Sequence, residues 1–306
     1  MKIICSLDEI TDIQDTGVAL GNFDGVHIGH QKLIKSAVDF CQANHLLSAV
    51  FTFRNHPKNL NGNSVKQIMT WEEKVEVMEE MGVDYLIAVE FNEEIMTIKP
   101  EDFLKDILLD KLRAKEIFCG FHYHFGHKAQ GDTELLDRMK EKYGYGLFVL
   151  GAVTYDDEVV SSTRIRELIE EGEMERCNKL LSRNYSVKGE VIPGKQLGKQ
   201  IGFPTANVIV KDYLAIPKNG VYISKTTVDN KVYKSVTNIG YNPTVGGQKR
   251  MVETFIMGLH EDIYGKEIKV EILKRIRPEI KFNNITELTN QIAADVKVAQ
   301  EYSYDF

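Results

Sequence analysis

The sequence predicts an α/β domain followed by a β domain. Up to about residue 182, short apolar runs alternate with amphipathic stretches, and from about Tyr185 the chain changes to runs with strand character. The first pattern is typical of a parallel sheet with helices on both faces, which binds ligands at the carboxyl ends of its strands. The second predicts six strands, and an antiparallel barrel would leave them no exposed edge. We therefore expect domains over residues 1–184 and 185–306.

The first half is assigned element by element from its hydrophobic pattern. TGVALG (16–21) is expected to be a short buried strand. In segment 30–42 apolar residues recur at helical spacing, so a helix is expected to begin where the run GNFDGVHIGH ends. Further strands are expected at 46–53, 84–91, 115–121 and 146–153, and helices at 71–81, 101–112, 132–143, 161–172 and 172–183.

The second half consists mainly of strands. They are expected at 185–192, 205–210, 220–228, 231–240, 252–259 and 266–276. Asp229-Asn230 separates two of these runs by two turn-forming residues, which indicates a hairpin. The amphipathic segment 285–303 predicts a C-terminal helix that starts near Thr286, a plausible N-cap, with Asn290 nearby. No internal repeat or low-complexity linker is visible, so the domain boundary rests on the change of pattern alone.

The composition excludes several classes of partner. The formal net charge is −7 and no stretch concentrates Lys and Arg, which disfavours DNA or RNA. The four cysteines are far apart without zinc-finger or CxxC spacing, so we expect reduced, buried thiols. The N-terminus lacks a charged-then-apolar signal, and the apolar runs are far below the ~20 residues of a membrane span. We expect a cytoplasmic enzyme without a membrane partner, and nothing in the sequence indicates an oligomer.

The run GNFDGVHIGH, residues 21–30, joins a glycine turn to two histidines at a strand-to-helix junction. A helix N-terminus carries unpaired N–H groups and about half a positive charge, which suits an anionic ligand. Gly25 and Gly29 would let the backbone approach that ligand closely. An isolated HxxH is more often a pair of surface or core histidines, but the full string is much more specific.

This string resembles the signature of the HxGH nucleotidyltransferase superfamily, in the variant found in bacterial FAD synthetases. The resemblance implies a Rossmann-like fold for the first domain. It also implies that His27 and His30 stabilise the triphosphate while a nucleotidyl group is transferred. The same resemblance assigns nucleotide binding to four neighbours of the histidines: Gly21, Phe23, Asp24 and Gly25.

Two further loops of the first half resemble segments of the same family. FTFRNHP (51–57) resembles FTFxPHP, which lines the nucleotide site, so His56 is a candidate there, with Asn55 in place of the first proline. Taken alone, His56 would be an ordinary loop histidine. CGFHYHFGHKAQGD (119–132) resembles the flavin and adenine loop and gives four flavin-binding candidates: His122, Phe125, Gly126 and Asp132.

The histidines of the second loop also allow a metal site. His122 stands where the family usually carries Asp or Asn, so its hydrogen-bonding role differs. His122 and His124 would lie on one face of a strand, with His127 close by, which is an arrangement for metal ligands. No fourth ligand is evident in the sequence.

VSSTRIRELIEEG (160–172) begins a helix with hydroxyls and two arginines. Ser161, Ser162 and Thr163 can cap the helix and donate to phosphate oxygens, and Arg166 can bind two oxygens at once. An isolated SST would be a simple helix cap. Following an HxGH site, however, the segment resembles the superfamily's second signature, (I/V)SSTxIR.

PGKQLGKQIGFPTAN (193–207) is a glycine-rich loop that is not a Walker A loop, because the glycine spacing is short by one and Gln200 follows Lys199. Glycine content alone would allow a flexible hairpin. GFPTAN resembles the riboflavin kinase signature, in which Thr205 and Asn207 would ligate a magnesium nucleotide. Lys199 stands where that family often has Arg. The loop residues implied to cover the phosphates are Gly194, Lys195, Gly198, Lys199, Gly202 and Pro204.

Two more residues match the kinase family. Glu253 in VETFI matches the catalytic base, and a carboxylate suits removal of a proton from a ribityl hydroxyl. The alternative for Glu253 is a charged residue on the outer face of a barrel strand. Arg277 matches a segment near the flavin or nucleotide, and Phe255 stands where His is common.

Taken together, the motifs resemble those of bacterial bifunctional riboflavin kinases/FMN adenylyltransferases, over nearly the whole chain. The resemblance implies that ATP phosphorylates riboflavin to FMN in the second domain and adenylylates FMN to FAD in the first, with Mg²⁺ in both sites. Two alternatives stay open. One half could be silenced by the substitutions at Asn55, His122 or Lys199. Alternatively, the protein could be a flavin sensor or store. The presence of His27, His30, Thr205, Asn207 and Glu253 argues against a sensor or store.

Overall fold

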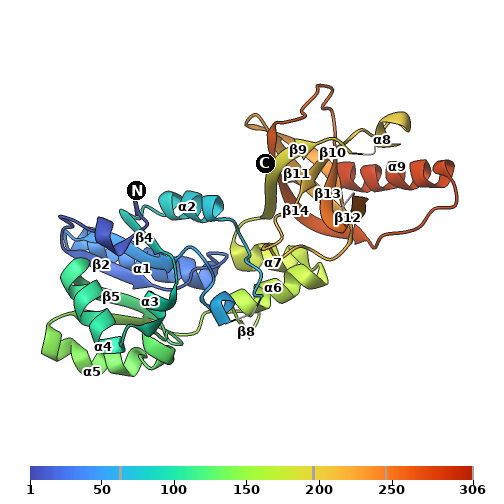
Figure 1. Ribbon diagram of the computed structural model, residues 1–306. Helices are drawn as coiled ribbons and strands as arrows, with labels where there is room; N and C mark the ends of the chain where they lie inside the picture. The colour runs from blue at the N-terminus through green and yellow to red at the C-terminus, as the bar shows by residue number, and fades with distance from the viewer. Residues whose placement is uncertain (62–63, 195–196, 245–246, 305–306) are drawn as a thin grey trace. The chain divides into compact units, whose positions relative to one another are not determined.

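The computed structural model describes residues 1–61, 64–194, 197–244 and 247–304 (Figure 1). The chain forms two compact units, Met1–Ser162 and Thr163–Phe306. Within the described ranges, no helix has the length and apolar character that crossing a bilayer requires.

The first unit contains a six-stranded sheet in the order β1-β4-β3-β2-β5-β6, and every neighbouring pair is parallel. The predicted parallel sheet is therefore confirmed. The chain moves from β2 to one side and returns to the other side of β2 with β5, so the order reverses between these two strands. The strands span Lys2–Ile4 (β1), Thr16–Leu20 (β2), Leu47–Phe53 (β3), Tyr85–Val89 (β4), Ala114–Gly120 (β5) and Gly146–Leu150 (β6).

Helices cover both faces of this sheet. Successive residues of β2 point to opposite faces, so Val18 and Leu20 join one apolar cluster and Ala19 the other. α1 and α2 contribute to the cluster of Ala19, and the π-helix η3 and α5 contribute to the opposite one. The helices span Ile28–Ala43 (α1), Trp71–Glu80 (α2), Glu93–Thr97 (α3), Pro100–Asp102 (α4), Phe103–Lys111 (η3) and Thr133–Tyr143 (α5).

Short elements complete the first unit. Short 3-10 segments and a two-stranded hairpin connect the larger elements. They span Leu7–Glu9 (η1), Pro57–Asn61 (η2), His127–Ala129 (η4), Thr154–Tyr155 (β7) and Glu158–Val159 (β8).

The second unit is built on a closed antiparallel barrel in the order β10-β13-β12-β11-β14-β9, as predicted. Asp229 and Asn230 have φ angles of 47° and 63° between β11 and β12, so the predicted hairpin is confirmed with a turn that matches strand twist. The strands span Tyr185–Ile192 (β9), Thr205–Ile209 (β10), Gly220–Val228 (β11), Lys231–Thr244 (β12), Gly247–Ile256 (β13) and Glu267–Arg277 (β14), and α8 spans Leu197–Gln200.

The barrel encloses a string of hydroxyl groups. Consecutive oxygens lie 2.7–2.8 Å apart, and all five side chains are fully buried. Each hydroxyl can donate and accept, so the string satisfies polar atoms that would otherwise destabilise a buried core. In order, the string runs through Thr226, Ser235, Ser224, Thr237 and Thr254.

The C-terminal helix α9 (Ile285–Glu301) packs against the outer face of the barrel, on β11 and β12 (Figure 1). Its N-cap is Asn284, whose side chain accepts the Glu287 N–H at 2.9 Å. The expectation that Thr286 caps this helix is therefore wrong. Thr286 already lies in the first turn, where its own backbone is helical, and Asn284 has the extended backbone that a cap requires.

The predicted helices at 161–172 and 172–183 are present as α6 (Ser162–Glu171) and α7 (Met174–Leu181). They belong to the compact unit of the barrel. The Asn178 side chain donates to the Ile272 carbonyl of β14 at 2.9 Å and accepts the Tyr185 N–H at 2.8 Å. The compact unit thus begins earlier than residue 185, while the predicted boundary between the catalytic domains, 184/185, stays a prediction.

This packing predicts that a fragment of residues 185–306 is less stable than one of residues 163–306. Deleting α7 removes four buried side chains, and the methionine and two leucines among them are each worth roughly 1.5–3 kcal/mol when fully buried. The melting temperature of the 185–306 fragment, measured by circular dichroism, should therefore be roughly 10 °C or more below that of the 163–306 fragment. Equal melting temperatures for the two fragments would show that α6 and α7 do not stabilise the barrel.

Candidate active sites

The first unit has a pocket of about 260 Å³ at the carboxyl ends of β2, β5 and β6. This is the point where the strand order reverses, the usual ligand site of an open parallel sheet. The pocket brings together residues from three separate sequence motifs. Of the predicted site residues, it is lined by Gly21, Phe23, His27, His30, His122, Ser161 and Ser162.

The two histidines form one structural unit at the start of α1. His27 is the N-cap, and its Nδ1 accepts the His30 N–H at 3.3 Å. The rings are stacked with centroids 3.6 Å apart, and the Phe23 ring meets His30 edge-on at 5.2 Å. Because Nδ1 of His27 accepts a hydrogen bond, a neutral His27 carries its proton on Nε2.

His30 is held in its neutral form. Burial, together with the nearby His27 and Lys74 side chains, keeps the pKa of His30 well below its usual range. Its Nδ1 is buried and finds no hydrogen-bond partner within the described part of the chain. A neutral imidazole can donate one hydrogen bond to a phosphate oxygen, so His30 is set as a donor rather than as a fixed charge.

The glycine turn before α1 depends on close packing. Gly25 has φ of +80°, and a Cβ there would lie 2.9 Å from Ile68. Asp24 is buried, and its Oδ1 accepts the Ile68 N–H at 3.0 Å. The Asp24 carbonyl accepts the Ser162 hydroxyl at 2.8 Å, which joins the two superfamily signatures directly. Asp24 thus organises the turn, and its nucleotide contact stays a prediction.

The other residues of the second signature are divided between the units. Ser161 lines the pocket, and the Ser162 hydroxyl is engaged with the first signature. Thr163 and Arg166 lie on α6, in the second compact unit, so their role at this pocket stays a prediction.

His56 lies in a small cleft at the carboxyl ends of β2 and β3. Its Nδ1 accepts the Lys58 N–H at 3.2 Å. Asn55 holds the same loop through two hydrogen bonds to the backbone of Phe91, at 2.7 and 2.8 Å. The Asn that replaces a proline therefore fixes the turn through its amide. The cleft is lined by Asn22, Asp24, Phe53, Arg54, Asn55, His56, Gln67 and Lys74.

Four residues of the predicted flavin loop line the pocket, Gly120, Phe121, His122 and Tyr123. Of the four flavin-binding candidates, His122 is among them, and its ring lies against Phe121 with centroids 3.6 Å apart. Phe125 is buried in the apolar core, and Asp132 caps α5 by accepting the Leu135 N–H at 2.8 Å. Gly126 has φ of +73° and contacts Pro100 so closely that a Cβ would not fit. Phe125, Asp132 and Gly126 thus each have a role in holding the fold, and their contact with flavin stays a prediction.

The expectation that His122 and His124 share one face of a strand is wrong. β5 ends at Gly120, and both histidines lie after it, His122 in a turn and His124 in irregular backbone. Among the residues that the structure describes, no group of three or more His, Cys, Asp and Glu side chains could hold a metal ion.

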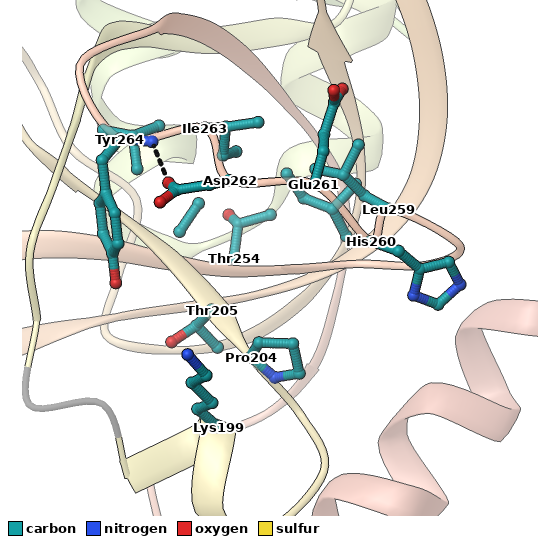
Figure 2. Close-up of a pocket in the computed structure, with 13 residues that line it drawn as sticks. Lys199, Pro204, Thr205, Thr254, Leu259, His260, Glu261, Asp262, Ile263 and Tyr264 are labelled. Atoms are coloured by element: carbon teal, nitrogen blue, oxygen red, sulfur yellow. Dashed lines mark hydrogen bonds between the residues drawn. The ribbon is translucent and has the colours of Figure 1, made fainter.

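The barrel unit carries two cavities that share Thr205. A cavity of about 430 Å³ is lined largely by the end of β13 and the loop after it (Figure 2). A second cavity, of about 300 Å³, lies on the outer face under α9 and includes Glu253, Phe255 and Arg277. In Figure 2, Lys199, Pro204 and Thr205 lie on one side of the first cavity, opposite Asp262 and Tyr264.

The alternation of β13 decides which side chain faces which cavity. Thr254 and Ile256 line the first cavity, whereas Glu253 and Phe255 line the second. Glu253 is paired in register with Asn207 of β10 and Asn238 of β12. The alternative placed Glu253 on the outer face of the barrel, and its side chain does point outward. However, α9 covers this part of the outer face, so Glu253 lines a cavity.

The glycine-rich loop packs closely on the barrel mouth. A Cβ at Gly194 would collide with the Asn207 side chain, and one at Gly198 with the Phe203 carbonyl. Asn207 is buried, and its Nδ2 donates to the Thr205 carbonyl at 3.3 Å. Gly202 has φ of +84°. Lys195 lies outside the described residues, and the phosphate contacts of the loop stay a prediction.

Arg277 is engaged in an ion pair that the sequence reasoning missed. Its guanidinium donates to both carboxylate oxygens of Asp295 at 2.8–3.1 Å, and its Nη1 donates to the Pro278 carbonyl at 3.0 Å. Asp295 is buried on α9, so the pair fastens α9 beside the second cavity.

Lys74, in the first unit, is a second buried charge that the sequence reasoning missed. A lysine near the start of a helix is unusual, because the helix dipole is positive there, and this could have drawn attention to it.

Comparison with protein families assigns a model to each half. The model of FAD synthetase matches residues 9–164, and the model of riboflavin kinase matches residues 181–303.

Curated relatives match over nearly the full chain. A bifunctional riboflavin kinase/FMN adenylyltransferase of Listeria monocytogenes is 38% identical over 296 residues, covering 94% of this chain and 92% of its own. The enzyme of the same name from Bacillus subtilis is 37% identical, covering 93% and 92%. The one from Escherichia coli is 31% identical, covering 99% and 98%.

A solved structure from Streptococcus pneumoniae, described as a macrolide-efflux protein, has the same fold, with a TM-score of 0.90, 29% identity and 99% coverage of both chains. The two family models match the two halves in order, and the relatives match nearly the whole chain. This chain belongs to the family of bifunctional riboflavin kinases/FMN adenylyltransferases.

Proposed function

We propose that the chain makes FAD from riboflavin in two ATP-dependent steps, one in each unit. The observation that carries this proposal is that each unit has its own site, the histidine pair at the switch point of the sheet and Glu253 beside Thr205 on the barrel. The substrates are the small molecules riboflavin, FMN and ATP, and the cytoplasmic location stays an expectation.

In the kinase step, the apolar cavity under α9 would hold the flavin ring and the first cavity the nucleotide. Glu253 would take the proton of a ribityl hydroxyl as its oxygen attacks the γ-phosphorus of ATP. The bond to the bridging oxygen breaks, and ADP leaves with FMN as the product. Thr205 lines both cavities and thus lies where the two substrates would meet.

In the adenylyl step, a phosphate oxygen of FMN would attack the α-phosphorus of a second ATP. The bond to the β-phosphate oxygen breaks, giving FAD and pyrophosphate. His27 and His30 would donate hydrogen bonds to the phosphate oxygens as negative charge shifts onto pyrophosphate, aided by the N-terminus of α1. Neither histidine forms a covalent intermediate in this scheme.

Mg²⁺ fits the donor set at the mouth of the barrel. Thr205 offers a hydroxyl and Asn207 an amide oxygen, and such hard oxygen ligands suit Mg²⁺ when phosphates complete its coordination. The ion would neutralise phosphate charge during transfer. In the first unit, we assign Mg²⁺ to the phosphates of ATP.

Two alternatives to the proposed function can be tested in one experiment. A single-activity enzyme would perform one half-reaction only, and a flavin sensor would perform neither while binding flavin. Incubation with riboflavin, Mg²⁺ and ATP, followed by chromatographic separation of riboflavin, FMN and FAD, distinguishes all three.

Replacing either histidine should stop FAD synthesis alone. His27→Ala and His30→Ala each lose a hydrogen bond to the transition state, worth about 2–4 kcal/mol, so FAD formation from FMN should fall roughly 30- to 1000-fold. FMN formation from riboflavin should be unchanged. His45→Asn, at an exposed histidine with φ of 56°, is the matched control. Normal FAD synthesis in both alanine variants would remove the pair from the mechanism.

Replacing Glu253 should stop FMN synthesis alone. Glu253→Gln keeps the shape of the side chain but removes its basicity, so kinase turnover should fall about 10²-fold or more while riboflavin still binds. FAD formation from supplied FMN should stay normal. Glu267→Gln, an exposed glutamate of the same barrel, is the control. An equal loss of both activities in Glu253→Gln would indicate a structural role.

The metal assignment predicts a difference between the two reactions of one variant. EDTA should abolish both reactions. Asn207→Ala should raise the Mg²⁺ concentration needed for half-maximal FMN formation by about tenfold, because one oxygen ligand is lost. The Mg²⁺ requirement of FAD formation should not change. If Asn207→Ala leaves both requirements unaltered, Asn207 is not a ligand.

A further inference from the structure

Lys74 is a buried cation in an unfavourable place. It lies in the first turn of α2, where the helix dipole is positive, and its exposed fraction is 8%. Burial lowers the pKa of Lys74 to about 8, against the opposing effect of the Asp24 carboxylate. The helix start does not need this lysine, because Thr70 and Glu73 form a complete capping box.

Within the described parts of the chain, Lys74 makes one side-chain hydrogen bond, to an acceptor that has a second donor. Its Nζ donates to the Asn22 carbonyl at 3.0 Å, but the Thr52 hydroxyl donates to the same carbonyl at 3.0 Å. Asn22 would therefore keep a donor without the lysine. An ammonium has three donors, and the described residues supply this single acceptor to Nζ.

Lys74 borders the small cleft that also contains His56 and Asp24. The cleft is formed at the carboxyl ends of β2 and β3, where the turn that leads to His27 begins. The positive charge of Lys74 also acts on the histidine pair, because it contributes to the lowered pKa of His30. The cleft and the histidines thus belong to one electrostatic environment.

Resting on the proposed function, we propose that Lys74 is a phosphate-binding residue of the adenylyltransferase site and contacts the phosphates that leave as pyrophosphate. The neutral His30 provides a donor but no charge, whereas a triphosphate brings several negative charges. Lys74 has unused donors and a desolvated charge, which binds an anion more strongly than an exposed lysine does. The substrate charge then compensates the burial of the ammonium.

The test uses the full chain and both directions of the reaction. Lys74→Met keeps the length of the side chain and removes the charge. Its KM for ATP in FAD formation, and its KM for pyrophosphate in the reverse reaction of FAD, should rise about tenfold or more. The KM for FMN should stay within about twofold. Lys74→Arg keeps the charge and should recover most of the affinity, and Lys35→Met, at an exposed lysine of α1, is the control.

Unchanged KM values for ATP and pyrophosphate in Lys74→Met would overturn the proposal. Equal rises in the KM for FMN and ATP, without rescue by Lys74→Arg, would also overturn it by indicating a structural role. FMN formation and thermal unfolding report whether the variant is folded, and Lys74→Gln replaces Lys74→Met if it is not. If the unmodified protein forms no FAD, the proposed function fails, and calorimetric binding of pyrophosphate to both forms still decides the role of Lys74.

Discussion

The hydrogen bond from the His30 N–H to His27 Nδ1 is the interaction on which the first site depends. It starts α1 at the end of β2, fixes the proton of a neutral His27 on Nε2, and sets the two rings in a stack. A serine or aspartate cap would start the helix equally well. A histidine cap makes the start of the helix and the reactive group the same residue, so the geometry of the site is as stable as the helix itself.

In the second unit, the corresponding constraint is the two-residue period of a strand. Glu253 and Thr254 are neighbours in sequence, yet they face different cavities. One strand can therefore place a carboxylate beside one substrate and shape the site of the other. The Arg277–Asp295 pair adds what the barrel alone lacks, because it fastens α9 as the outer wall of the second cavity.

The sequence was sufficient for features that depend on local pattern. Buried strand β2, the Asp229-Asn230 hairpin and the histidine turn follow from alternation, turn chemistry and spacing. The sequence was insufficient where distant contacts decide the outcome. Asp295 is paired across 18 residues, α7 packs on strands of the barrel, and Lys74 donates to the carbonyl of Asn22, 52 residues away in the sequence. No local sequence pattern indicates such contacts. The N-cap of α9 is Asn284 rather than Thr286 because of the backbone angles at Asn284, and the sequence of two nearby polar residues does not reveal those angles.

The hydroxyl string inside the barrel gives the core a direction. A linear string of five hydroxyls can order its hydrogens in one sense or in the opposite sense, and each sense satisfies every internal bond equally well. One terminus, Thr254, faces the first cavity, and the other, Thr226, does not line it. A group in that cavity that accepts a hydrogen bond from Thr254 selects one sense for the whole string. The polarity of the barrel interior is thus set at its mouth by the chemical nature of what enters.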